Sequence, residues 1–160
     1  MPTHLPNQPA EPPEQLHQRL RERIGRKQWT VLEVQPDKSG PVFYYTVGLT
    51  ALGLPELVLF GLDPQTGQKA LESIAVMLAE GLRPNDGTLL HNILRNVPVS
   101  LREIPDMKTQ IHMRYASEFF PDGIRGMQVI WPDIAGNFPW QRDYDSSMAV
   151  YQRLLTETMH

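Results

Sequence analysis

A continuous apolar run, Leu57-Val58-Leu59-Phe60-Gly61-Leu62, directly follows Pro55-Glu56. The run has the length of a strand, and neither of its alternating faces carries a polar side chain. A strand of this kind must be covered on both sides. We therefore expect it to be a central strand of a sheet, with other elements packed against both of its faces.

A β-hairpin is predicted just before this run. Residues 29–34 and 42–49 are rich in β-branched and aromatic side chains, which favour strands. The segment between them, residues 36–41, contains two prolines, an aspartate and a glycine, which are typical of turns.

Three helices are predicted from apolar residues that recur every three or four positions. They cover residues 14–24, 64–78 and 105–120, and the second begins with Asp63-Pro64, an N-cap followed by a first-turn proline. The stripe of the third helix consists of Met107, Ile111, Tyr115 and Phe119. A short fourth helix is expected at residues 146–155.

Strands are also expected at residues 97–104 and 126–131, whereas residues 88–94 fit neither pattern. Together these elements predict an α+β fold with a mixed, largely antiparallel sheet of about five strands flanked by two to four helices. Residues 14–160 are expected to form one globular domain after a flexible, proline-rich tail at residues 1–13.

Composition excludes several functional classes. The chain has 160 residues, no cysteine and a formal net charge of -3, so we expect no disulfide, no cysteine nucleophile and no nucleic-acid partner. Neither a secretory signal nor an apolar run long enough to span a membrane is evident. These features predict a soluble, cytoplasmic protein without a membrane partner.

Several segments together resemble a known family. They are Tyr45-Thr46-Val47-Gly48-Leu49-Thr50, Pro55 through Leu62, Pro98-Val99-Ser100-Leu101-Arg102, Gln128-Val129-Ile130-Trp131-Pro132-Asp133, Phe138-Pro139-Trp140 and Tyr144-Asp145. The pattern, from about residue 25 to residue 145, resembles the domain of unknown function 4262, a family of small, mostly bacterial proteins. This resemblance implies no catalytic residue. The positions of interest that it implies are Tyr45, Thr46, Gly48, Leu49, Pro55, Glu56, Gly61, Trp131, Pro132, Asp133, Gly136, Pro139 and Trp140.

The strand at residues 42–49 contains the first candidate site. One of its faces carries Tyr44, Thr46 and Gly48, two hydroxyls beside a position without a side chain, and Tyr45 lies on the other face. Such a surface could admit a ligand. The alternative is that Gly48 accommodates a bulge or a packed tryptophan.

The loop from Trp131 to Trp140 contains the second candidate site. Its aromatic residues, Trp131, Phe138 and Trp140, are of the kind found both in interface anchors and in lids over small cores. Asp133 has two interpretations as well, an Asx-turn former or an acid catalyst.

No cofactor or metal site is predicted. The five histidines include no pair with ligand spacing on one helix, and no phosphate-binding glycine motif is present.

Two functional hypotheses follow, with an unknown small molecule or protein as partner. The first is a binding or protein-interaction module that uses the aromatic and glycine-lined surface. The second is a small enzyme in which Tyr44 or Tyr45, Glu56 and Asp133 transfer protons in one pocket. Homo-oligomer formation through the apolar residues of the first helix stays open.

Overall fold

The computed structural model of the chain describes residues 12–36 and 40–156. The tail expected at residues 1–13 lies outside the described residues as far as residue 11. Helix α1 begins at Pro13, where a proline suits the first helical turn.

The core of the molecule is a mixed sheet of six strands in the order β1-β2-β3-β6-β5-β4. The strands are β1 (Thr30–Val34), β2 (Phe43–Val47), β3 (Glu56–Phe60), β4 (Thr88–Leu90), β5 (Val99–Glu103) and β6 (Gly126–Ile130). Among the strand pairs of the described residues, only β3–β6 is parallel. The predicted α+β class, the antiparallel pairing of the two hairpin strands and the central position of β3 are confirmed. Residues 37–39 of the predicted turn lie outside the described residues. The additional strand is β4, which lies in the segment that fitted neither pattern.

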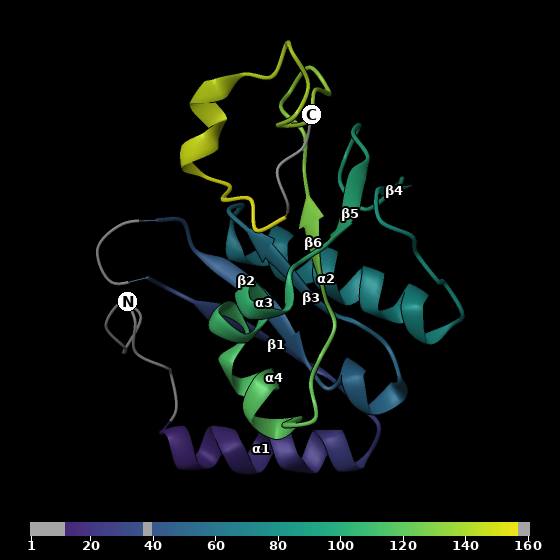
Figure 1. Cartoon of the computed structure of the whole chain (residues 1–160), viewed down its shortest axis with the longest axis vertical. Coiled ribbons are helices and arrows are strands. Elements are labelled where there is room, and N and C mark those ends of the chain that lie inside the picture. The colour runs from purple at the N-terminus through teal and green to yellow at the C-terminus, as the bar shows by residue number, and fades with distance from the viewer. Residues whose placement is uncertain (1–11, 37–39, 157–160) are drawn as a thin grey trace.

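Helices cover both faces of the sheet (Figure 1). They are α1 (Pro13–Gly25), α2 (Pro64–Ala79), α3 (Asp106–His112) and α4 (Arg114–Phe119), and two 3-10 turns, η1 (Leu49–Leu52) and η2 (Ser146–Val150), complete the secondary structure. Helix α2 packs on the face that contains Leu57 and Leu59. Helices α1 and α4 pack on the opposite face, which contains Val58 and Phe60, because side chains alternate along β3.

Helix α2 forms where its sequence predicts. The Asp63 carboxylate accepts a hydrogen bond of 3.1 Å from the backbone N–H of Thr66, which satisfies a free donor of the first turn. The apolar stripe, which includes Leu71 and Ile74, is fully buried against the sheet. Burial of each such side chain stabilises the fold by about 1.5–3 kcal/mol.

The helix predicted at residues 105–120 is instead two short helices, separated at Met113. Met113 has φ -106° and ψ 62°, outside the helical region. This break changes the helical phase, so Met113 and Ala116 are fully buried, whereas Met107 and Ile111 are 73% and 60% exposed. The predicted four-residue stripe was therefore wrong for Met107 and Ile111.

The helix predicted at residues 146–155 is also wrong. The chain makes one 3-10 turn, η2, in which the Asp145 carboxylate accepts from the backbone N–H of Ser147 at 3.1 Å. Residues 151–156 then run without helical structure to the end of the described chain. We call residues 151–156 the C-terminal strap.

Among the described residues, no helix combines the length and apolar character that are needed to cross a membrane.

Candidate functional site

The carboxylate of Glu56 lies at the centre of the first predicted cluster, where β2 ends and β3 begins. The hydroxyls of Thr46 and Thr50 each donate to it at 2.7 Å. The backbone N–H groups of Gly48, Leu49 and Thr50 also donate to it, at 3.2, 3.3 and 2.9 Å. The two carboxylate oxygens thus accept five hydrogen bonds from the turn that leads out of β2.

These contacts assign Glu56 to the structure of the turn. Burial raises the pKa of Glu56 above its ordinary value, and the hydrogen bonds from Thr50 and Thr46 lower it in part. Its five donors belong to Thr46 of β2, to Gly48 and to the first two residues of η1. The carboxylate therefore fixes the chain reversal from β2 into η1 rather than facing a substrate.

The hydroxyls of Tyr44 and Tyr45 are also bonded inside the fold. Tyr44 donates to the carbonyl of Leu62 at 2.9 Å, and Tyr45 accepts from the backbone N–H of Tyr115 at 3.1 Å. Burial, followed by the charges of Glu33 and Asp63, raises the pKa of Tyr44 to about 12. Burial also raises the pKa of Tyr45. Both hydroxyls stay protonated near neutral pH.

Gly48 faces the backbone of the two residues that directly precede β1. Its φ is +128°, and a Cβ built there would lie 2.6 Å from the carbonyl oxygen of Gln28 and 2.9 Å from Cα of Trp29. The space beside Gly48 is therefore filled by the backbone next to Trp29. Tyr44, Thr46 and Gly48 thus belong to the core in this structure.

Trp131 and Asp133 hold the second predicted segment in place. The indole N–H of Trp131 donates to the carbonyl of Phe60 at 2.7 Å, which ties the end of β6 to β3. The Asp133 carboxylate accepts from the backbone N–H groups of Asn137 and Asp145, both at 2.8 Å. The backbone donor at Asp145, followed by that at Asn137, holds the pKa of Asp133 below its usual value. Asp133 organises the loop that follows β6.

Phe138 and Trp140 form a stacked pair in the same loop. Their ring centroids lie 5.1 Å apart at an interplanar angle of 4°. Arg102 of β5 places its guanidinium carbon 5.2 Å from the centroid of Trp140, within the range of a cation–π contact. Phe138 is buried, whereas Trp140 is partly exposed.

The same arginine pairs with Asp86. Nε of Arg102 lies 2.9 Å from Oδ1 of Asp86, and the backbone N–H of Glu103 donates to that oxygen at 2.9 Å. Burial alone would raise the pKa of Asp86, but the Glu103 N–H and the Arg102 guanidinium hold it below its usual value. We call the set Asp86, Arg102, Phe138 and Trp140 the rim site.

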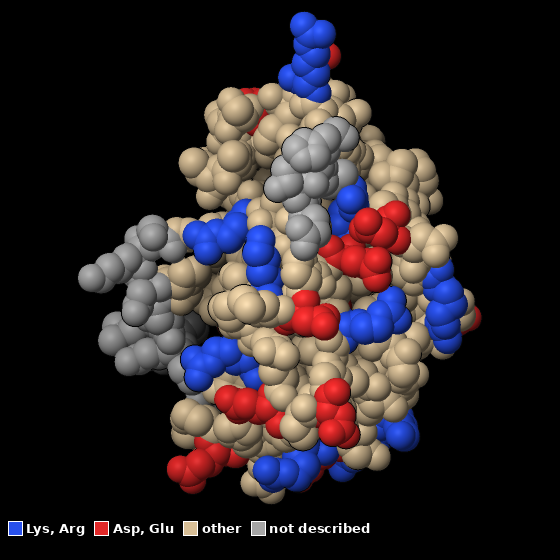
Figure 2. All heavy atoms as spheres, in the orientation of Figure 1, with Lys and Arg blue, Asp and Glu red and all other residues tan. Residues whose placement is uncertain are grey.

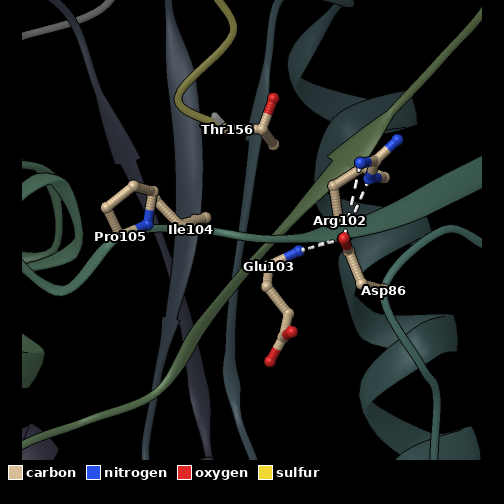
Figure 3. Close-up of a pocket in the computed structure, with 6 residues that line it drawn as sticks. All are labelled: Asp86, Arg102, Glu103, Ile104, Pro105 and Thr156. Atoms are coloured by element: carbon tan, nitrogen blue, oxygen red, sulfur yellow. Dashed lines mark hydrogen bonds and ion pairs between the residues drawn. The ribbon is translucent and has the colours of Figure 1, made fainter. Parts of the chain in front are cut away.

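A hollow of about 330 Å³ adjoins the rim site (Figure 3). Six residues line it: Asp86, Arg102, Glu103, Ile104, Pro105 and Thr156. Four of them, Arg102 to Pro105, come from β5 or the segment that follows it, Asp86 comes from the turn before β4, and Thr156 belongs to the C-terminal strap. Arg102 is thus shared between the hollow and the aromatic pair.

The two predicted clusters lie at opposite ends of the sheet. Strands β3 and β6 are parallel, and Glu56 is opposite Gly126 at the start of β6. Trp131 and Asp133 follow the other end of β6. The structure therefore does not bring Glu56 and Asp133 into one pocket, and the concavity expected between the Tyr44–Gly48 face and the aromatic loop is not formed.

Sequence reasoning did not single out the hollow or the charged half of the rim site. Asp86 lies in a Pro-Asn-Asp-Gly turn, where an aspartate is explained by turn chemistry. Arg102 lies on the polar side of an alternating strand, where an arginine is ordinary. Its partners Asp86 and Trp140, both distant in the sequence, distinguish Arg102 from an ordinary arginine on a polar strand face.

The face of the molecule drawn in Figure 2 is not dominated by charges of one sign. Figure 2 shows acidic and basic side chains interspersed over one face of the molecule. Among residues 12–36 and 40–156, no group of three His, Asp or Glu side chains is arranged to hold a metal ion. Three apolar residues of α1, Leu16, Leu20 and Ile24, were considered for a contact between copies. Leu16 and Leu20 are buried in the chain's own core, and Ile24 is partly buried against it.

Comparison with known proteins identifies one family. The family model described as "Domain of unknown function (DUF4262)" matches residues 23–145, which confirms the resemblance seen in the sequence. No curated protein and no solved structure matches the chain significantly.

Proposed function

We propose that this chain, which belongs to the DUF4262 family, is a protein-binding domain and that its contact surface is the rim site with the adjoining hollow. The single observation that carries the proposal is the shared position of Arg102. Its guanidinium joins the Asp86 carboxylate, the ring of Trp140 and the wall of the hollow.

The residue types of the rim site are those that dominate binding energy at protein interfaces. Tryptophan and arginine are enriched among the residues whose truncation weakens binding most. Here the two side chains are already in contact, and Phe138 and Asp86 hold them from either side. Because this geometry exists before a partner arrives, binding loses little additional side-chain entropy.

The dimensions of the site favour a protein over a small metabolite. A hollow of about 330 Å³ is close to the lower limit of ligand pockets, which are about 300–1,000 Å³. It lies beside an aromatic pair and an ion pair at the surface, so it fits one protruding side chain of a larger partner. The partner backbone would then extend over Trp140.

The proposal is tested by selecting peptides from a random displayed library against the full chain. Dissociation constants of the selected peptides are then measured for the full chain and for Arg102→Leu and Trp140→Ala. We expect each substitution to weaken binding about tenfold or more, since residues of this kind contribute about 2 kcal/mol or more.

Arg142→Leu is the matched control, because Arg142 is an exposed arginine outside the rim site. It should leave affinity within about twofold, as is usual for a residue outside the contact. The proposal is wrong if the selected peptides bind Arg102→Leu and Trp140→Ala as tightly as the unmodified chain.

A further inference from the structure

The C-terminal strap is held on the sheet by two glutamine side chains. The Gln128 amide donates to the carbonyl of Arg153 at 2.6 Å and accepts from the backbone N–H of Leu155 at 2.8 Å. The Gln152 amide accepts from the backbone N–H of Trp131 and donates to its carbonyl, both at 2.9 Å. Each glutamine thus bonds both a donor and an acceptor of the backbone opposite it.

These four bonds resemble those by which a peptide is added to a sheet as an extra strand. Here glutamine side-chain amides replace one partner of each backbone-to-backbone hydrogen bond. The amide of Gln128 forms its hydrogen bonds with backbone groups of the strap, and every residue except proline offers the same N–H and C=O groups. We call the surface under the strap, which includes Gln128, Trp131 and Ile104, the track. The track would therefore accept the backbone of other extended segments.

Two positions of the strap supply side-chain selectivity. Leu155 is buried at 2% exposure in the apolar cluster that contains Phe60 and Ile104. Gln152, three positions earlier, is buried at 3% exposure and makes the paired bonds to Trp131. A glutamine followed by a leucine three positions later is thus the pattern that the track binds in the chain itself.

The track lies within the residues that the family model matches, whereas the strap lies outside them. The family model matches residues 23–145, which include Gln128, Trp131 and Ile104 of the track. The strap lies beyond the matched residues. The domain shared with the family therefore contains the binding track, and a segment outside that match occupies it in this chain.

The track leads directly to the hollow beside the rim site. Thr156, the last described residue of the strap, lines the hollow. Its hydroxyl is buried and has no hydrogen-bond partner among the residues that the structure describes. A segment seated on the track would thus continue toward Arg102 and Trp140.

We infer that the strap is an intramolecular occupant of a peptide-binding track, which binds an extended Gln-x-x-Leu segment of a partner protein when the strap is released. This inference rests on the proposed function, because the track ends at the hollow, and it identifies the partner as an extended peptide. The strap competes with that peptide. The apparent affinity for the peptide therefore equals the affinity of the free track multiplied by the fraction of molecules in which the track is free.

The test uses the full chain and a fluorescein-labelled peptide with the sequence of residues 150–156. Binding is measured by fluorescence anisotropy for the unmodified chain and for the double variant Gln152→Ala/Leu155→Ala, which weakens the strap and leaves Gln128 in place. We expect the double variant to bind the peptide about tenfold or more tightly than the unmodified chain. Adding Gln128→Leu should abolish this gain.

A second peptide, in which aspartate replaces the residue equivalent to Leu155, is the matched control and should not bind. Thermal unfolding shows whether the double variant still folds cooperatively. Equal binding of the first peptide by the folded double variant and by the unmodified chain would overturn the inference.

Hydrogen exchange on the unmodified chain keeps the test decisive even if the double variant does not fold. The backbone N–H of Leu155, which depends on Gln128, should exchange about tenfold or more faster than ladder amides of β6, through local release of the strap. Exchange of Leu155 only at the rate of global unfolding would contradict a releasable strap.

Two further outcomes separate the alternatives. A dimer that the double variant no longer forms, measured by light scattering, would assign the track to the strap of a second copy and overturn the partner-peptide assignment. Library peptides that lose affinity with Trp140→Ala but not with Gln128→Leu would support the proposed function and refute the track. Library peptides that lose affinity with Gln128→Leu but not with Trp140→Ala would support the track and refute the rim site as the contact surface.

Discussion

The hydroxyl of Thr46 donates a hydrogen bond of 2.7 Å to the carboxylate of Glu56, and both residues are fully buried. The same hydroxyl accepts from the backbone N–H of Leu57 at 2.9 Å, so it joins the end of β2 to the start of β3. Glu56 and Thr46 therefore act as a structural pair, although the sequence marked both as candidates for a ligand site.

Glu56→Gln should destabilise the fold. The amide group places a donor where the carboxylate accepts from N–H and O–H groups, so at least one buried donor loses its partner. We expect the free energy of unfolding to fall by about 1–3 kcal/mol, measured by urea denaturation. Glu80→Gln, at an exposed position, is the control and should change it by less than about 0.5 kcal/mol.

The pH dependence of stability provides a separate test of Glu56. Its pKa is raised in the folded protein, so its contribution is most favourable below the pKa of the unfolded chain, about 4.3. That contribution declines as pH rises through the folded-state pKa. Glu56→Gln should remove this decline from a plot of unfolding free energy against pH, and an unchanged plot would contradict the raised pKa.

Trp131→Phe should destabilise the fold more than the same change at Trp29. The indole of Trp131 donates to the buried carbonyl of Phe60, whereas that of Trp29 contacts the exposed carboxylate of Glu72. Leaving a buried carbonyl unpaired costs about 1–3 kcal/mol, and loss of the exposed contact costs about 0.5 kcal/mol or less. Urea denaturation of both variants gives the comparison, and equal losses would argue against the buried bond.

Asp133→Asn should lower stability at neutral pH and weaken its acid dependence. The pKa of Asp133 is depressed by the backbone N–H groups of Asp145 and Asn137, so its contribution is present above the unfolded value of about 3.9. It is lost as pH falls through the lower, folded-state pKa. Melting temperatures of both proteins, followed from neutral to acid pH, should converge at the acid end.

Gly48→Ala should be strongly destabilising, whereas Gly25→Ala should not. Gly48 has φ +128°, and a Cβ there would meet the backbone at 2.6 Å. The strained conformation alone costs about 1–3 kcal/mol. Gly25 ends α1 with open space around it, so alanine there should be neutral or stabilising by up to about 1 kcal/mol. Thermal unfolding of the two variants distinguishes them.

Local patterns were sufficient for the elements that depend on neighbouring residues. The apolar run of β3, the β-branched and aromatic residues of β1 and β2, and the Asp63 cap of α2 each carry their signal within a few positions of the sequence. The break at Met113 carries no comparable signal. It depends on which residues of α3 and α4 pack against α1 and the sheet, and those contacts join distant parts of the sequence. The course of the strap likewise depends on Gln128, which lies far away in the sequence.

The candidate site likewise combines features that local sequence patterns predict with features that depend on distant residues. Aromatic and glycine-rich segments were recognisable, but their spatial relation follows from the parallel pairing of β3 and β6, and periodicity does not determine strand pairing. That pairing separates Glu56 from Asp133. The antiparallel pairing of β5 with β6 places the aromatic loop, which follows β6, close to β5, where Arg102 meets Trp140.

The most direct test of the central claim is to map where a selected peptide binds. The full chain, labelled with nitrogen-15, is titrated with the peptide and followed by two-dimensional NMR. The account predicts that the largest shifts occur at the backbone amide and indole N–H of Trp140 and at the backbone amide of Arg102, with little change at Glu56. Shifts confined to another surface, with Trp140 and Arg102 unaffected, would contradict it.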